Sequence, residues 1–228
     1  MKRIDVLDHG FVRLVDHMGG DLSIVRSARV SHDAAWRAGE NEGSDQRLIN
    51  YLWRNGHTTP FEAVTLTFEV KAPIFVMRQW HRHRTWTFNE VSARYTELPE
   101  EFYVPAIDQI SAQSTTNKQG RAAEAHPEAA YLETAMRRAN EESFKQYKYM
   151  IAQGTSRELA RTVLPVATYS HMFATVNLLN LFRFLTLRTD LHAQYEIRVY
   201  AEAMIGLARG VAPVAVSAWD ASTKEQPR

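Results

Sequence analysis

The sequence of 228 residues contains no cysteine. That absence excludes disulfide bonds, thiolate metal ligands and any reaction in which a cysteine thiolate attacks a substrate. The glycine-rich phosphate-binding patterns GxGxxG and GxxxxGKS/T are also missing, so neither a Rossmann nor a P-loop site is indicated. No repeat occurs at the spacing of a solenoid. Any phosphorylated ligand must therefore be held by other side chains.

Net charge and long apolar runs are scarce as well. The formal charge of +1 at pH 7 argues against a general binder of nucleic acids or membrane surfaces. The first ten residues, MKRIDVLDHG, lack the apolar core of a signal peptide. The late stretch VNLLNLFRFLTL is too short and too polar to cross a bilayer. We expect a cytoplasmic protein with neither a membrane nor a nucleic-acid partner.

The length favours a single domain over residues 1–228. Alternating or turn-bounded apolar stretches predict strands at 11–18, 64–70 and 168–176. The helices between them vary in length, and no regular βαβ alternation is present. The expected fold class is α+β, a mixed or antiparallel sheet with flanking helices.

Helix boundaries follow from capping residues. The pattern predicts helices at 21–31, 44–55, 74–80, 127–152, 177–186 and about 191–209, and one from 155–158 to near Pro165. Asp21, Ser44 and Asn177 are the expected N-caps, and 155–158 is read as a capping box. Residues 108–126 are expected to form a surface loop with little chemistry, and 222–228 a frayed tail.

Positive charge is concentrated in residues 78–95, RQWHRHRTWTFNEVSARY, which hold four arginines, two histidines and two tryptophans against one glutamate. Guanidinium groups are planar donors suited to phosphate and carboxylate. In an extended chain, Arg82 and Arg84 would lie on one face about 6–7 Å apart and could straddle a pyrophosphate. Flat apolar surfaces for a heterocycle are expected from Trp80, Trp86 and Phe88. The segment suits a ligand with several phosphates and flat rings.

Three other interpretations of this segment stay open. It could be a solvated basic face whose tryptophans are simply buried. His81 and His83 could bind a metal, although a third ligand is missing nearby. Basic and aromatic residues together could also bind single-stranded nucleic acid.

The same residues resemble a known signature. Arg82, His83, Arg84, Ser92 and Arg94, with Thr87 at a position where serine is usual, are similar to the signature of the flavin-dependent thymidylate synthases. Further blocks resemble that family in the same order: SARVSHD at 27–33, GHTTPFE at 56–62, KAPIFVMRQW at 71–80, ELARTVLP at 158–165 and LRTDLHAQYEI at 187–197. The resemblance covers nearly the whole chain apart from about 108–150 and the C-terminal tail.

The resemblance implies methylation of dUMP to dTMP, with methylenetetrahydrofolate giving the carbon and FAD, reduced by NADPH, giving the hydride. The missing cysteine agrees with this chemistry, because the other class of thymidylate synthase attacks uracil with a thiolate. The family resemblance also implies a homotetramer with shared active sites.

Site residues follow from the same resemblance. Arg188 is the implied catalytic residue, whose positive charge near the uracil N3–O4 edge would stabilise the ring as an anion. FAD contacts are implied for Thr59, Arg82, His83, Arg84, Glu90, Asn177, Leu178, Leu179 and Arg183, with His57 ordering flavin and substrate. Contacts to dUMP are implied for Gln79, Trp80, His81, Arg82, Glu90, Val91, Ser92, Ala93, Arg94 and Arg188, and for Arg161 from a neighbouring subunit. No metal site is expected. A nucleotide-binding module without catalysis remains an alternative, and it would not need Arg188.

Overall fold

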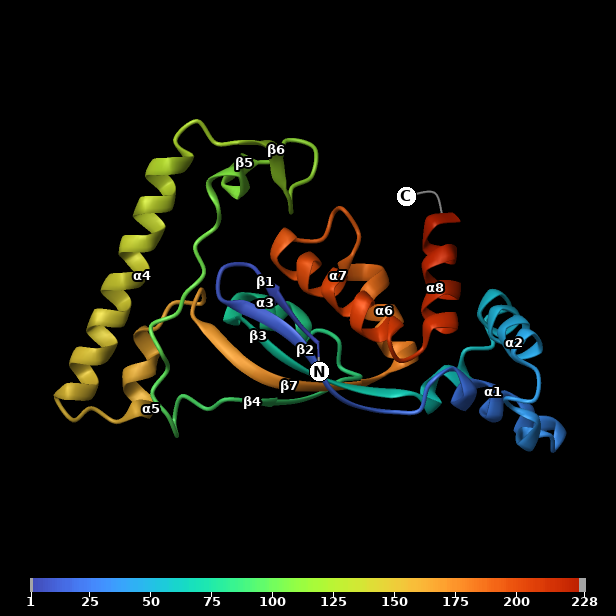
Figure 1. The fold of residues 1–228 in the computed structure, drawn as a ribbon. Helices are drawn as coiled ribbons and strands as arrows, with labels where there is room; N and C mark the ends of the chain where they lie inside the picture. Colours follow the sequence, from blue (N-terminus) through green and yellow to red (C-terminus); the bar gives the residue numbers. More distant parts are fainter. Residues whose placement is uncertain (1, 226–228) are drawn as a thin grey trace.

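The computed structural model describes residues 2–225 and contains a five-stranded antiparallel sheet (Figure 1). The strands lie in the order β1-β2-β3-β7-β4. Their bounds are β1 Arg3–Val6, β2 Gly10–Met18, β3 Thr65–Pro73, β4 Thr87–Glu90 and β7 Tyr169–Asn177. The expected α+β class is confirmed, and so are the three strands that the pattern predicts. β1 and β4 are additional edge strands of only four residues each.

Helices lie over one face of this sheet and at its ends (Figure 1). They are α1 Asp21–Arg29, α2 Glu42–Arg54, α3 Ile74–Trp80, α4 Ala129–Ala152, α5 Arg157–Ala160, α6 Leu178–Arg188, α7 Tyr195–Arg209 and α8 Pro213–Glu225. Short 3-10 helices are η1 Val30–His32, η2 Ala35–Arg37, η3 Thr59–Ala63, η4 Ile107–Gln109 and η5 Arg161–Val163. The helices α3, α6 and α7 lie over one face of the sheet, whereas α4 and α5 lie beyond one end (Figure 1). No helix within residues 2–225 has the length and apolarity that a membrane crossing requires.

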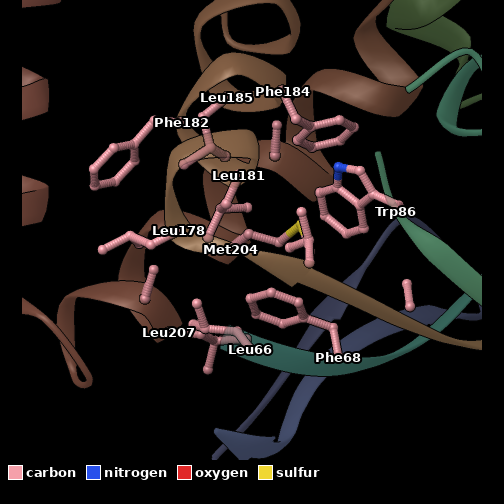
Figure 2. Packing of buried hydrophobic residues seen from close by; sticks show 14 of the residues in the cluster. Leu66, Phe68, Trp86, Leu178, Leu181, Phe182, Phe184, Leu185, Met204 and Leu207 are labelled. Carbon is pink, nitrogen blue, oxygen red and sulfur yellow. The ribbon is translucent and has the colours of Figure 1, made fainter. Parts of the chain in front are cut away.

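The core forms between the sheet and α6 and α7. Leu66 and Phe68 of β3 lie opposite Val176 and Ala174 of β7, so their side chains share one face of the sheet. Figure 2 shows this face meeting apolar side chains of both helices, Leu178, Leu181, Phe182, Phe184, Leu185, Met204 and Leu207. Burial of such side chains is the main driving force of folding. The packing fixes α6 over the sheet and thereby places the residues at both of its ends.

Two helix caps differ from the expectation. Asp21 does not cap α1; its carboxylate accepts hydrogen bonds from the main-chain nitrogens of Val214 and Ala215, at 2.9 and 3.0 Å, and so caps α8. The cap of α2 is Asn41, whose side chain accepts from the nitrogen of Ser44 at 2.9 Å. The expected cap at Ser44 is wrong because the helix begins two residues earlier, at Glu42.

The expected capping box at 155–158 is also absent. The N-cap of α5 is Ser156, and its side chain makes no capping hydrogen bond. Glu158 instead forms a salt bridge with Arg94 at 3.1 Å, and Arg157 pairs with Glu97. The carboxylate of Glu158 pairs with Arg94 instead of with helix amides, and the two ion pairs tie α5 to the segment after β4.

The segments expected as loop and tail are ordered elements. Residues 108–126 include a hairpin of β5 Ser111–Gln113 and β6 Arg121–Ala125, which carries a partly buried ion pair to α7. The helix expected from about 191 begins only at Tyr195, and α8 follows it. Trp219 of α8 is buried and Ser222 accepts a hydrogen bond from Trp53, so the tail interpretation is wrong up to residue 225. Residues 226–228 lie outside the described residues.

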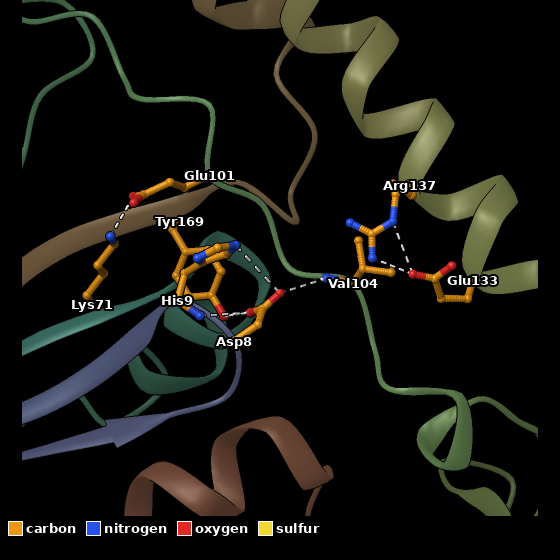
Figure 3. A network of polar contacts seen from close by, with 8 residues as sticks. All are labelled: Asp8, His9, Lys71, Glu101, Val104, Glu133, Arg137 and Tyr169. Carbon is orange, nitrogen blue, oxygen red and sulfur yellow. Dashed lines mark hydrogen bonds and ion pairs between the residues drawn. The ribbon is translucent and has the colours of Figure 1, made fainter. Parts of the chain in front are cut away.

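The chain between β4 and the hairpin is tied to the sheet by polar contacts (Figure 3). Asp8, in the turn after β1, accepts hydrogen bonds from the hydroxyl of Tyr169 at 2.5 Å and the nitrogen of Val104 at 3.4 Å. Lys71 and Glu101 form a salt bridge at 2.5 Å. These contacts hold the segment 97–110 at one end of the sheet, where β3 ends and β7 begins.

Candidate active site

The arginine-rich segment folds as a turn between α3 and β4. The main-chain nitrogen of His83 donates to the carbonyl of Trp80 at 2.9 Å, and that of Trp86 donates to His83 at 3.3 Å. The extended geometry expected for Arg82 and Arg84 is therefore wrong, because the amides of Arg82 and His83 donate to carbonyls at the end of α3 and that of Trp86 donates within the turn. Both arginine side chains are exposed and make no hydrogen bond or salt bridge within residues 2–225. Their guanidinium groups are free to bind an anion.

The two tryptophans of this segment belong to the core. Trp80 is 0% exposed and Trp86 is 5% exposed, and the ring of Trp80 stacks on Phe184 of α6 at 5.0 Å. The expectation that they offer faces to a flat ligand is wrong, and the side chain of Trp80 is closed off from a substrate. Phe88 alone stays partly exposed, with its ring 4.7 Å from that of His81. No group of three metal-binding side chains forms within the described chain.

Arg188 occupies the C-terminal end of α6 and reaches back to the turn. Its Nε donates to Nε2 of His83 at 3.1 Å, and its Nη2 donates to the carbonyl of Gln79 at 3.3 Å. Burial lowers the pKa of Arg188. Both acceptors are neutral, and no salt bridge among the described residues involves this arginine. The site therefore holds a half-buried positive charge without a negative partner.

His83 is the neutral support of that charge. Burial, and after it the charge of Arg188, lower the pKa of His83 from 6.5 to about 4. Because Nε2 accepts from Arg188, the ring proton is assigned to Nδ1. The ring also packs edge-on against Phe184 at 4.9 Å. At neutral pH the imidazole orients the guanidinium without adding a second charge.

Gln79 lies directly beside this pair. Its main-chain carbonyl accepts from Arg188, and its side-chain nitrogen donates to the side-chain oxygen of Gln194. Sequence reasoning gave Gln194 no role, although it stands in the same block as Arg188. Membership of that block was the one sequence feature that could have pointed to a role for Gln194. The structure thus brings together Gln79, His83 and Arg188, and it adds Gln194.

Other residues expected to bind substrate lie at the end of β4 and directly after it. Glu90 ends this strand, and its Oε1 accepts from the hydroxyl of Ser170 on β7 at 2.5 Å. The nitrogen of Val91 donates to the carbonyl of His171 at 2.8 Å, which extends the pairing with β7 by one residue. The strand therefore carries Glu90 and Val91 away from the turn along the edge of the sheet.

The next three residues form a tight turn. The hydroxyl of Ser92 accepts from the nitrogen of Arg94 at 3.3 Å, and Ala93 is buried. The guanidinium of Arg94 is exposed and bound to Glu158 of α5. A phosphate at Arg94 would have to share or replace this exposed salt bridge, which costs little free energy.

A second group of expected residues lies at the opposite end of α6. Asn177 caps this helix by accepting from the nitrogen of Asn180 at 2.9 Å, which confirms the expected cap. The side chains of Leu178 and Leu179 are buried, and the nitrogen of Leu178 donates to Val64. Eleven residues at 1.5 Å each separate Asn177 from Arg188 by about 16 Å. The two ends of α6 cannot serve one small reacting centre within one chain.

The remaining expected residues accompany this second group or stand alone. Thr59 begins η3, which packs against α6, and His57 is exposed with its ring 6.0 Å from that of Tyr51. Arg183 is exposed on α6 and donates to Asn180 at 3.1 Å. Arg161 lies on η5, and its exposed side chain makes no hydrogen bond or salt bridge within residues 2–225.

Comparisons with known proteins agree with this arrangement. The family described as "Thymidylate synthase complementing protein" matches residues 13–214. The flavin-dependent thymidylate synthase of Treponema denticola is 48% identical over 225 residues, which covers 98% of this chain and 84% of that protein. The enzyme of the same name from Ruegeria pomeroyi is 47% identical, covering 94% of this chain and 72% of that protein.

A solved structure agrees in three dimensions. The UMP/dUMP methylase PolB from Streptomyces cacaoi, bound with 5-Br dUMP, has a TM-score of 0.86 and is 39% identical. The match covers 96% of this chain and 97% of that one. Identity at this level over nearly the full length, together with the arginine turn and the order of the matching blocks, places the chain in the family of flavin-dependent thymidylate synthases.

Proposed function

We propose that this protein methylates dUMP to dTMP, using methylenetetrahydrofolate as carbon donor and FAD, reduced by NADPH, as hydride donor. Family membership supports the reaction class. The observation that carries the assignment within this chain is Arg188, a half-buried cation held by two neutral acceptors. Such a cation favours an anionic ligand that balances its charge. A uracil ring is such an anion once it has lost the proton at N3.

Arg188 acts by electrostatic stabilisation. A guanidinium stays protonated even when burial lowers its pKa, so it keeps its charge throughout the reaction. Placed at the N3–O4 edge of uracil, it stabilises negative charge in the ring and makes C5 more nucleophilic. Its two anchors, His83 and Gln79, hold it in place before substrate arrives, which removes reorganisation from the reaction.

The residues of the turn fit a flavin dinucleotide. Arg82 and Arg84 present unpaired, exposed guanidinium groups, the donors that best match a pyrophosphate. We propose that they hold FAD with His83 and Glu90, and that Thr59, Asn177 and Arg183 hold it from the other end of α6. When bound, FAD supplies the hydride that completes the methyl group. The protein supplies position and charge, and no cysteine is needed.

The separation along α6 supports a shared site. Residues about 16 Å apart in one chain meet if one copy contributes the Arg188 end and another contributes the Asn177 end. We therefore propose a homotetramer whose active sites are built from several chains, with Arg161 reaching dUMP from a neighbouring one. Ligand sites are common at such junctions.

The absorption spectrum of the purified protein tests the flavin. A flavin band is expected, and a colourless protein that takes up neither FAD nor dUMP would reject the proposal. Anaerobic reoxidation of the reduced protein by dUMP and methylenetetrahydrofolate should yield dTMP. Flavin without reoxidation would indicate a binding module instead. UMP should be tested in parallel, since the similar solved structure is described as a UMP/dUMP methylase.

Substitution of Arg188 tests the catalytic assignment. Arg188→Ala is expected to retain FAD and to lose turnover by about a hundredfold or more, because a preorganised charge on the reacting ring is lost. Arg47→Ala, at an exposed arginine of α2, is the matched control and should keep full activity. Wild-type turnover in Arg188→Ala would reject the assignment.

A further inference from the structure

Two glutamines face each other at the Arg188 end of the site. Gln79 is the penultimate residue of α3, and Gln194 is the N-cap residue of α7. The side-chain nitrogen of Gln79 donates to the side-chain oxygen of Gln194. Because its carbonyl also accepts from Arg188 at 3.3 Å, Gln79 is held through both its main chain and its side chain.

The side chain of Gln194 is free for this contact. It makes no capping hydrogen bond to α7, although N-cap positions often use one. Its main-chain carbonyl accepts from the nitrogen of Arg198 at 3.1 Å, so the backbone is fixed in the first turn of the helix. Gln194 is exposed whereas Gln79 is half-buried, which means that Gln194 closes on Gln79 from the solvent side.

The first turn of α7 is itself anchored by an ion pair whose carboxylate is buried. Glu196 is 2% exposed, and its carboxylate accepts from Nη2 of Arg121 at 2.7 and 2.6 Å. The hydroxyl of Tyr103 donates to the same carboxylate at 3.1 Å, and burial together with Glu196 raises the pKa of Tyr103, which keeps it a donor. Arg121 is fixed further through its bond to the carbonyl of Gln109 at 2.7 Å. The backbone of Gln194 therefore has little freedom.

We propose that Gln194 is a positioning residue that fixes the side-chain orientation of Gln79 for substrate binding, and that the Arg121–Glu196 pair holds Gln194 in place. The inference rests on the proposed function, in which Gln79 contacts dUMP. A free glutamine side chain samples many rotamers, and ordering it upon binding weakens affinity. Gln194 orders it before the ligand arrives.

A double-mutant cycle tests this role. The dissociation constant of dUMP is measured on the FAD-loaded protein for wild type, Gln79→Ala, Gln194→Ala and the double variant. Gln194→Ala is expected to raise the dissociation constant of dUMP about three- to tenfold, which is the effect of one side chain that must be ordered on binding. In the Gln79→Ala background the same change should have no further effect. At saturating dUMP, kcat should stay near that of wild type while KM rises.

Controls separate this proposal from a general loss of structure. Gln46→Ala removes an exposed glutamine of α2 that donates to Glu42 at 3.1 Å, and it should leave dUMP binding unchanged. Unchanged binding in Gln194→Ala would overturn the proposal, and so would additive effects in the cycle, because Gln194 would then act independently of Gln79.

Crystal structures without substrate keep the test independent of the proposed function. Gln79 is expected in one rotamer in wild type and in several in Gln194→Ala. A single rotamer in both would overturn the positioning role. A wild-type protein that fails to bind dUMP would reject the proposed function instead, and the rotamer comparison would still decide whether Gln194 orders Gln79.

Discussion

The contact between His83 and Arg188 exists only while the imidazole is unprotonated. Nε2 of His83 accepts from Nε of Arg188 at 3.1 Å, and a protonated ring has no lone pair to offer. Burial and the neighbouring positive charge lower the pKa of His83 to about 4. Arg188 therefore keeps its orientation across the neutral pH range, and the two residues form one unit in which a neutral ring fixes a permanent cation.

The titration of His83 checks this unit. Its ring resonances, followed by NMR, should not titrate between about pH 5 and 8 in wild type. Arg188→Met removes the nearby charge and should raise the pKa of His83, although not fully to 6.5 because burial is the larger cause. Since the folded pKa is lowered, the stability from neutral His83 is complete above pH 6.5 and declines as pH falls toward 4. A wild-type midpoint near 6.5 would contradict the assignment.

Single residues also show where sequence reasoning ends. The cluster of arginines in residues 78–95 marked the segment for anion binding, and its arginines 82 and 84 are indeed exposed and unpaired. That the side chains of Trp80 and Trp86 point into the core was not predictable, because both pack on Phe184, about a hundred positions away in the chain. Gln194 was missed for the same reason, since its partner Gln79 belongs to another element.

At the scale of elements, Asp21 joins the first helix to the last. It stands in the first turn of α1, yet its carboxylate accepts from two main-chain nitrogens of α8. Four amides at the start of every helix lack partners within it, and a side-chain acceptor there stabilises the helix. Asp21 thus holds together two helices about 190 residues apart in sequence.

Substitution of Asp21 measures this cap. Asp21→Ala should lower the free energy of unfolding by about 1–2 kcal/mol, as loss of an N-cap does. Asp21→Asn should lose less, because it keeps an acceptor and removes a carboxylate whose burial raises its pKa. Asp16→Ala is the control, because the exposed carboxylate of Asp16 accepts only from the nitrogen of His17 among residues 2–225. Urea denaturation followed by circular dichroism gives the values, and equal losses for Asp21→Ala and Asp16→Ala would contradict the capping role.

The hairpin β5–β6 is tied to α7 by one ion pair. Arg121 joins it to Glu196 on α7, whose side chain is 3% exposed. Removing the arginine leaves the buried carboxylate without its partner charge, so Arg121→Ala should lower the free energy of unfolding by about 3 kcal/mol. Amide hydrogen exchange over residues 111–125 should accelerate. Arg137→Ala breaks the exposed pair with Glu133 on α4 (Figure 3) and should cost at most about 0.5 kcal/mol. Unchanged exchange in Arg121→Ala would show that the hairpin is held by other contacts.

Some helices and strands have a clear local sequence pattern, and others do not. β3 and β7 carry strong alternation because one face is buried under α6, and α6 begins at an asparagine that does cap it. The hairpin and α8 lack such local signals. These two elements are held in place by partners far along the chain: Arg121 of the hairpin pairs with Glu196, and α8 is capped by Asp21. Contacts with partners so far along the chain leave no local periodic pattern to detect.

At the scale of the whole molecule, the expected site residues fall into separate groups. Gln79, His83 and Arg188 lie together, whereas Asn177 and Thr59 lie near the far end of α6, about 16 Å along its axis. The resemblance to a family supplied every one of these residues, but the sequence could not show their separation. The packed position of α6 is what supports the proposal that one chain contributes to more than one site.

A mixing experiment tests whether sites are shared between chains. Arg161→Ala and Arg188→Ala should each be inactive as pure proteins if both arginines act on dUMP. When the two are unfolded together in equal amounts and refolded, a site assembled from two chains can take a native Arg161 from one and a native Arg188 from the other. Random assembly then restores roughly one site in four. The measured quantity is dTMP formation per flavin, compared with refolded wild type.

Pairing each variant with the double variant Arg161→Ala, Arg188→Ala provides the control, because no combination of those chains contains both arginines. If the mixture of single variants stays as inactive as these controls while retaining flavin, each chain must supply both arginines to its own site. That result would contradict the proposal that Arg161 reaches dUMP from a neighbouring chain. Recovery near one quarter instead requires that dUMP lies where two chains meet, because only a site that takes its two arginines from different chains can regain activity in this mixture.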